Sequence, residues 1–106
     1  MINNFKNIFT EIFSWEKGED FKEILRCKNV VIERIISSDQ PDNIIYNQIQ
    51  DEWVILLQGN ATLQVAEKIY DLTSGDYLFI SANTPHQVIK TSKDPFCIWL
   101  AIHIYD

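Results

Sequence analysis

"QDEWVILLQGNATLQV", residues 50–65, is the stretch that decides the fold. Its apolar run is long enough for a buried strand, and the dipeptide Gly59-Asn60 that follows is a turn signal leading into a second strand. The first strand opens on two adjacent carboxylates, Asp51 and Glu52, which are costly to bury unless they are paired or bound to a metal. The partners of these two carboxylates must therefore come from the rest of the chain or from a bound ion.

Short β-type segments continue on both sides of this hairpin, with turn signals between them and no helical pattern. About eight such segments indicate an all-β fold, as an antiparallel sandwich or a closed barrel. Tight turns with positive φ are expected at Gly59-Asn60 and Ser74-Gly75. Besides the hairpin, strands are expected in "NVVIERIIS", "NIIYNQ", "KIYDL", "YLFIS", "HQVIKT" and "FCIWLAIHIY", residues 29–37, 43–48, 68–72, 77–81, 86–91 and 96–105.

The N-terminal segment has a different period, which predicts a short helix. Its apolar residues recur at the i, i+3, i+4, i+7 and i+8 positions of one helical face, and "EDFKEILR" (19–26) is expected to add a further turn or two. We therefore expect a helical segment over 1–28 and a β-domain over 29–106. The residues of the predicted helical face are Phe5, Ile8, Phe9, Ile12 and Phe13.

The bulk properties predict one soluble domain. At 106 residues the chain is large enough for a core but too small for two domains, and its hydrophobic share of 46% is ordinary. A net charge of −6 argues against nucleic-acid binding, and no apolar run approaches the roughly 20 residues that span a bilayer. Because the start lacks the pattern of a signal peptide, and Cys27 and Cys97 lack CxxC spacing, we expect a cytoplasmic protein with reduced thiols that binds no membrane.

Two spaced motifs resemble those of the cupin superfamily, whose fold is a jelly-roll β-barrel. In the first family motif, G-x5-H-x-H-x3-4-E-x6-G, Glu52 and Gly59 match, while the histidine positions fall on Tyr46 and Gln48. In the second, G-x5-P-x-G-x2-H-x3-N, only Gly75 and His86 match, while Ser81, Asn83 and Lys90 take the other named positions.

A second resemblance covers the chain from about residue 30 onward. It is to a group of small, single-domain bacterial cupins, mostly uncharacterised, which resemble metal-dependent cupins but lack their full ligand set. The resemblance implies a cupin-type jelly-roll barrel with a degenerate metal motif. It rests on "ERI" (33–35), "YNQIQDEWV" (46–54), "GDYL" (75–78), "TPHQV" (84–88) and "WLAIH" (99–103).

The resemblance also implies a site at the barrel mouth. In a metal-binding cupin the two histidines, the glutamate and the later histidine point inward and share one cation. Tyr46, Gln48 and Glu52 have the same strand parity, so they can face one cavity if no bulge near residues 49–50 intervenes. The predicted site is therefore Tyr46, Gln48, Glu52 and His86, with His103 as a fifth member, and its catalytic residues are unknown.

Other interpretations of these residues stay open. His103 is more typical of a structural histidine, Glu52 can pair with Arg34, and Tyr46 and Gln48 can line a pocket without metal. Arg34 and Glu33 fall on opposite faces of their strand. In the last strand the sequence leaves open which face points inward: Cys97, Trp99, Ala101 and His103, or Phe96, Ile98, Leu100, Ile102 and Ile104.

Three functions remain as hypotheses. Gln48, Glu52, His86 and His103 would suit Zn, Mn, Fe(II) or Ni better than Mg, so the first is a metal-dependent enzyme acting on a small metabolite. The second is a metal-free protein that binds or senses a small polar ligand. The third is an interaction module that uses the N-terminal Phe face. A homodimer is expected, since exposed strand edges and the Phe-rich segment favour pairing.

Overall fold

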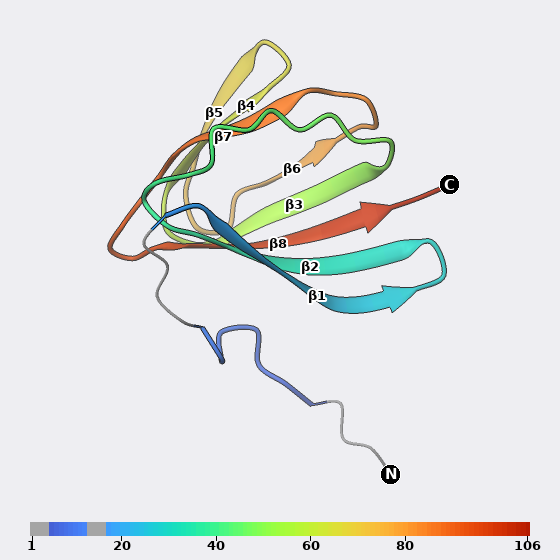
Figure 1. The fold of residues 1–106 in the computed structure, drawn as a ribbon, viewed down its shortest axis with the longest axis horizontal. Coiled ribbons are helices and arrows are strands. Elements are labelled where there is room, and N and C mark those ends of the chain that lie inside the picture. The colour runs from blue at the N-terminus through green and yellow to red at the C-terminus, as the bar shows by residue number, and fades with distance from the viewer. Residues whose placement is uncertain (1–4, 13–16) are drawn as a thin grey trace.

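The computed structural model describes residues 5–12 and 17–106, which form eight β-strands (Figure 1). The predicted all-β fold is confirmed, and every pairing between strands is antiparallel. None of these residues forms a helix that could cross a membrane. The strands are β1 (Glu19–Cys27), β2 (Val30–Ser37), β3 (Asp51–Gln58), β4 (Ala61–Val65), β5 (Lys68–Leu72), β6 (Tyr77–Ile80), β7 (His86–Thr91) and β8 (Cys97–Ile104).

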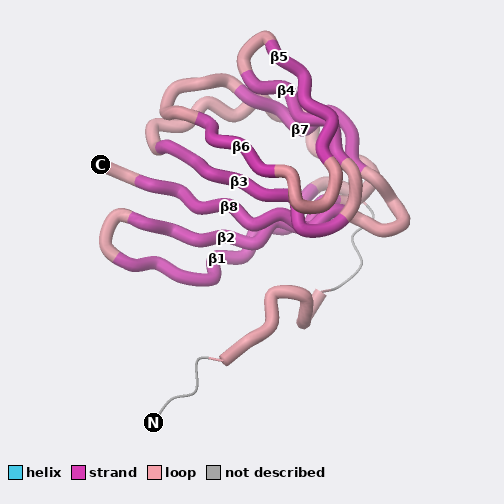
Figure 2. The backbone as a smooth tube through the Cα atoms, turned by 180° about the vertical axis from the view of Figure 1, so that it is seen from behind, coloured by secondary structure: helices cyan, strands magenta, loops and turns pink. Residues whose placement is uncertain are grey.

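The strands build two sheets that face each other (Figures 1 and 2). The large sheet has the order β1-β2-β8-β3-β6 and the small sheet the order β5-β4-β7. The predicted closed barrel is not seen, because no ladder within the described part of the chain joins the two sheets at their edges. The predicted strand over 43–48 makes only an isolated bridge between Tyr46 and His86, so the small sheet ends at β7.

The predicted N-terminal helix is also not seen. Residues 5–12 form turns and irregular chain, and Phe13 of the predicted helical face lies outside the described residues. A helix this short is marginal in water without extensive packing. The backbone carbonyls instead accept hydrogen bonds from a side chain of the sheet, since Arg34 Nη1 donates to Ile8 O at 3.0 Å and to Thr10 O at 2.8 Å.

Residues 19–26, expected to extend the helix, instead belong to the edge strand β1 (Glu19–Cys27). This segment pairs with β2 along its whole length, with a register shift between Glu23 and Leu25. Pairing covers the backbone groups of β2 that a helix would leave exposed at the sheet edge. The sheet therefore extends further toward the N-terminus than the periodicity of the sequence indicated.

The core lies between the two sheets and settles the orientation of β8. Trp99 Nε1 donates to Ser37 Oγ of β2 at 3.0 Å, so both strands direct these side chains inward. His103 has the same parity and also points inward. The buried core side chains are Val54, Leu56, Ala61, Leu63, Leu72, Ile80, Cys97, Trp99 and Ala101.

The two tight turns lie where they were predicted. Gly59 joins β3 to β4 with φ of 94°, and Gly75 lies between β5 and β6 with φ of 98°. Both values fall in the region that only glycine adopts without strain. The turn at Gly59 fixes the β3–β4 hairpin, and with it the position of Glu52 at the start of β3.

Candidate functional site

Three buried ionisable side chains meet between the sheets. Glu52 is the second residue of β3 and lies opposite His103 of β8, while His86 is the first residue of β7. Alternation places Glu52 on the same face as Val54, and His103 on the same face as Ala101, both of which belong to the core. The exposed fractions are only 6% for Glu52, 8% for His86 and 7% for His103.

One carboxylate oxygen is the centre of this group. Glu52 Oε1 lies 3.8 Å from His86 Nε2 and 3.9 Å from His103 Nδ1. It also accepts a hydrogen bond of 2.9 Å from Gln48 Nε2. The structure thus brings together four of the predicted site residues, while the two imidazole nitrogens stay beyond hydrogen-bonding distance of the carboxylate.

The outer nitrogen of each imidazole is held by an oxygen. His86 Nδ1 lies 3.0 Å from Thr84 O, and His103 Nε2 lies 3.1 Å from Glu33 Oε1. Because carbonyl and carboxylate oxygens only accept, these partners assign the ring hydrogen to the outer nitrogen in both neutral histidines. The inner nitrogens, which face Glu52, then carry lone pairs.

This donor set fits a cation. Imidazole lone pairs beside a carboxylate oxygen repel it unless a proton, a hydrogen-bond donor or a metal ion lies between them, and here only the lone pair of His103 has such a donor, the amide of Gln50. Imidazoles that bind metals commonly donate their other N–H to a carbonyl or a carboxylate, as His86 and His103 do. Two histidines with one carboxylate form a ligand set typical of non-haem iron(II) and related first-row metals.

The distances between Glu52 and the two imidazoles are longer than those between the ligands of a bound metal ion. Ligands at about 2.1 Å from one ion lie roughly 3.0–3.4 Å apart, so both imidazoles would have to move closer to Glu52. Consistent with this spacing, no cluster of three His, Cys, Asp or Glu side chains in residues 5–12 and 17–106 has the geometry of a ready-made metal site. Two amides take the place of a metal at these atoms. Gln48 Nε2 donates a hydrogen bond to Glu52 Oε1, and Gln50 Nε2 lies 3.2 Å from His103 Nδ1.

The surroundings are acidic, which favours a positive charge. The hydrogen bond to Glu33 raises the pKa of His103 above its ordinary value, against the effect of burial, and the charge of Glu52 adds to the rise. Burial raises the pKa of Tyr46, and nearby carboxylates including Glu19 and Glu52 add to the effect. Tyr46 therefore keeps its proton at neutral pH, so that its hydroxyl is able to donate a hydrogen bond.

Tyr46 is positioned against His86 rather than toward Glu52. The two residues exchange backbone hydrogen bonds of 2.8 and 2.9 Å, and their rings stack with centroids 5.8 Å apart. Gln48 follows on the same segment and donates to Glu52. The irregular segment over 43–50 thus delivers both predicted residues to the site, although it is not a strand.

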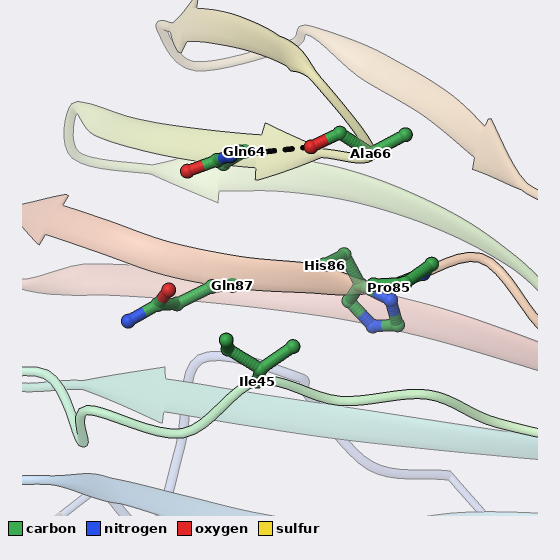
Figure 3. Close-up of a pocket in the computed structure, with 6 residues that line it drawn as sticks. All are labelled: Ile45, Gln64, Ala66, Pro85, His86 and Gln87. Atoms are coloured by element: carbon green, nitrogen blue, oxygen red, sulfur yellow. Dashed lines mark hydrogen bonds between the residues drawn. The ribbon is translucent and has the colours of Figure 1, made fainter.

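A small hollow adjoins His86 (Figure 3). Its volume is about 160 Å³, less than that of a typical pocket for a drug-sized ligand, which is roughly 300 Å³ or more. Of the predicted site residues, only His86 lines it, so it is not the predicted pocket around Glu52. The lining residues are Ile45, Gln64, Ala66, Pro85, His86 and Gln87.

Sequence reasoning missed two partners of His103. Glu33 and Gln50 contact its two ring nitrogens, and neither was among the predicted site residues. The available signal for Glu33 was its parity with Ile35, which packs against the core. Arg34 faces outward to the N-terminal segment, so the alternative pairing of Glu52 with Arg34 does not occur.

Comparisons with known proteins point to one family. A family model described as a cupin domain matches residues 45–103. Among solved structures, a protein from Ralstonia eutropha JMP134 that is provisionally named a mannose-6-phosphate isomerase is 31% identical, with a TM-score of 0.84. The match covers 96% of this chain and 98% of that one. A search of curated proteins found no match.

More distant structures share the fold alone. A cupin superfamily protein from Desulfitobacterium hafniense DCB-2 is 21% identical with a TM-score of 0.76, covering 90% of this chain and 84% of that one. The iron(II) form of HppE is 18% identical with a TM-score of 0.70, covering 81% of this chain and 50% of that one.

Proposed function

Because this chain belongs to the cupin family, we propose that it binds a first-row divalent metal between Glu52, His86 and His103. The metal centre would hold a small polar metabolite that carries hydroxyl or carboxylate oxygens. Glu52 Oε1, His86 Nε2 and His103 Nδ1 are the proposed ligands. A turned amide of Gln48 offers a fourth donor in place of the missing family histidine.

The observation that carries this proposal is the orientation of the two imidazoles. Both direct an inner nitrogen toward the same carboxylate oxygen, while Thr84 O and Glu33 Oε1 hold their outer nitrogens. A neutral imidazole has one donor and one acceptor nitrogen, and in both histidines the oxygen partner satisfies the donor and leaves the acceptor directed at the carboxylate. Two histidines arranged in this way around one buried carboxylate are what a cation requires of its ligands.

Three or four protein donors leave coordination positions for a ligand. A first-row metal in such a site supplies Lewis-acid polarisation of a bound oxygen. The chain supplies a buried acidic surrounding and the Tyr46 hydroxyl on the adjacent segment. The iron(II) named in the HppE structure supports metal binding in this fold, and the isomerase name of the Ralstonia protein supports a small-molecule ligand.

Metal-free binding of a small polar ligand is the second candidate. The amides of Gln48 and Gln50 contact Glu52 Oε1 and His103 Nδ1, two of the atoms proposed to bind the metal. They therefore provide hydrogen-bond partners for both side chains in the absence of a metal. In this case the hollow beside His86 would hold the ligand, and metal would leave its affinity unchanged. Calorimetry with and without metal separates the two candidates.

The proposal is tested by titrating the metal-stripped protein with Mn, Fe(II), Ni and Zn in a calorimeter. We expect about one equivalent of metal per chain, bound less tightly than by three histidines. His86→Ala should weaken binding by roughly 100-fold or more, because it removes a direct ligand. Ile89→Ala, further along β7 and 43% exposed, should leave binding unchanged.

Two results would contradict the proposal. One is wild-type protein that takes up no metal at millimolar concentration, and the other is His86→Ala that binds as tightly as wild type. If His86→Ala loses its far-UV circular dichroism, Glu52→Gln replaces it, because glutamine keeps the volume of glutamate and can pair with Gln48. Glu52→Gln should show the same loss of metal binding.

A further inference from the structure

Three strands of the large sheet each direct a carboxylate to its inner side. Glu33 of β2 contacts His103, and Glu52 of β3 lies opposite the same histidine. Glu19 of β1 lies opposite the fully buried Ser37, which donates a hydrogen bond of 2.7 Å to Glu19 Oε2. Because directly opposite residues share one face of a sheet, Glu19 faces inward as Ser37 does.

A fourth carboxylate, that of Asp42, lies beside Glu19. A Cβ atom on Gly18 would lie 2.9 Å from Asp42 Oδ1, so this carboxylate contacts the backbone directly before Glu19. Burial raises the pKa of Glu19 most, and the charges of Asp42 and Glu52 raise it further, so these groups act on one another. We call the four residues the acidic wall: Glu19, Glu33, Asp42 and Glu52.

Tyr46 connects the acidic wall to a proposed metal ligand. Its ring stacks on His86 with centroids 5.8 Å apart. Burial raises the pKa of the Tyr46 hydroxyl most, and the charges of all four residues of the acidic wall raise it further. A molecule bound to a metal between His86 and Glu52 would therefore lie within the field of these carboxylates.

No basic side chain offsets the acidic wall. All nine Lys and Arg residues lie in the described part of the chain, and none of them forms a hydrogen bond or an ion pair with these four residues. Among the nine, only Arg34 is buried, and its guanidinium donates to the N-terminal segment on the outer side of the sheet. Arg26 of β1 is exposed and is already paired with Glu23 at 2.6 Å.

A divalent metal would not neutralise the acidic wall. Its two positive charges are balanced by Glu52 and Glu33, which leaves Glu19 and Asp42 without a basic partner. A phosphate dianion entering this partly buried place would be repelled at short range, where salt screens little. A hydroxyl group meets no such repulsion, and an ammonium group would gain a partner in Glu19, whose ionised form is disfavoured by burial.

On the basis of the metal binding proposed above, we propose that the ligand of this site is a neutral or cationic molecule, such as a polyol or an amino alcohol. The acidic wall excludes phosphates and other molecules with a net negative charge. Glu19 is then a specificity-determining residue that does not itself bind the metal. A phosphorylated sugar, the kind of molecule in the name of the Ralstonia protein, would be excluded from this chain.

The test uses the full chain loaded with Co(II), whose visible absorption changes when a molecule joins its coordination sphere. Uptake of cobalt is measured first by elemental analysis. A chain that takes up none contradicts the metal binding, and with it this proposal, whereas titration of the loaded protein tests the selectivity alone. The probes are imidazole, which is neutral at pH 8, and inorganic phosphate at the same pH.

Imidazole should bind at least about 10-fold more tightly than phosphate to the wild-type protein. Glu19→Gln should strengthen phosphate binding by roughly 5- to 10-fold and leave imidazole binding unchanged, because it removes one repelling charge. Glu67→Gln removes the same charge from an exposed turn, so it is the matched control and should change neither affinity.

Three results would overturn the proposal. The first is phosphate that binds the cobalt-loaded wild type as tightly as imidazole does. The second is a ratio of the two affinities that Glu19→Gln changes no more than Glu67→Gln. The third is a spectrum that neither probe alters, because the metal then has no open position. Should Glu19→Gln fail to fold, Asp42→Asn must give the same gain in phosphate binding.

Discussion

Glu52 is a buried carboxylate whose surroundings suit a bound cation better than two neutral imidazoles with no ion between them. Its Oε1 atom receives one hydrogen bond from Gln48 and faces two imidazole nitrogens at 3.8 and 3.9 Å. A buried charge is costly unless it is paired and hydrogen-bonded. A metal ion at this place would offset the burial of Glu52 and the repulsion between the inner lone pairs of His86 and His103.

Glu19 provides a test of burial at a single residue outside the proposed metal site. Burial raises its pKa above the ordinary value of 4.5, while Ser37 Oγ donates to its Oε2 at 2.7 Å. In the window between 4.5 and the raised pKa, the folded state binds more protons than the unfolded state. Stability therefore falls as pH rises through this window, and the ionised carboxylate remains destabilising at neutral pH.

Glu19→Gln should consequently raise the melting temperature at pH 7, since glutamine keeps an acceptor for Ser37 without the buried charge. The gain should disappear below about pH 4, where the Glu19 carboxyl group is protonated in both the folded and the unfolded state. Glu67→Gln removes the same charge from an exposed turn and serves as the control. Equal gains for both variants, or a gain that does not depend on pH, would refute the role of burial.

The sequence predicted part of the site from spacing. Glu52 and His86 were placed by family motifs, and strand parity placed Glu52 with Val54 and Leu56 on the core side. Glu33 and Gln50 were missed, because they contact His103 only if its side chain points into the space between the sheets. That orientation depends on the pairing of β8 with both β2 and β3, which a single chain segment does not reveal.

At the scale of elements, the β3–β4 turn is a point of close packing. A Cβ atom on Gly59 would lie 2.8 Å from Cys97 Sγ and 3.1 Å from Cys97 Cα, in addition to the strain at φ of 94°. Gly59→Ala should therefore lower the free energy of unfolding by roughly 2–4 kcal/mol. Urea denaturation followed by Trp fluorescence measures this loss.

Gly75→Ala is the matched control for that substitution. Gly75 has nearly the same φ, 98°, but a Cβ atom there would have no neighbour within 4 Å. Only the backbone strain remains, so the expected loss is about 1 kcal/mol. Equal losses for both variants would show that the contact with Cys97 contributes nothing.

The elements also differ in how well the sequence predicted them. The hairpin β3–β4 was predicted because alternating apolar residues and Gly59-Asn60 agree on one structure. The helix predicted within residues 1–28 is not seen in the described part of that segment, because its apolar period competes with contacts to Arg34 that are remote in sequence. β1 was misassigned for the same reason, since its pairing with β2 outweighs local helical preference.

In the molecule as a whole, the two faces of the large sheet differ in character. Its inner face carries Glu52, Glu33 and His103, and its outer face carries uncharged side chains such as Trp53 and Ile102. Because side chains alternate along each strand, neighbouring residues serve opposite faces. Trp53 and Glu52 are adjacent in sequence, yet Trp53 lies on the outer face of the sheet and Glu52 lies in the proposed metal site.

Anomalous diffraction from crystals grown with about 1 mM Mn or Zn tests the proposed metal site most directly. We predict one strong anomalous peak per chain, within roughly 2.0–2.3 Å of Glu52 Oε1, His86 Nε2 and His103 Nδ1. Gln48 and Gln50 should then have left their present hydrogen bonds. Absence of a peak there, with Gln48 still bound to Glu52 and Gln50 to His103, would contradict the proposed metal site.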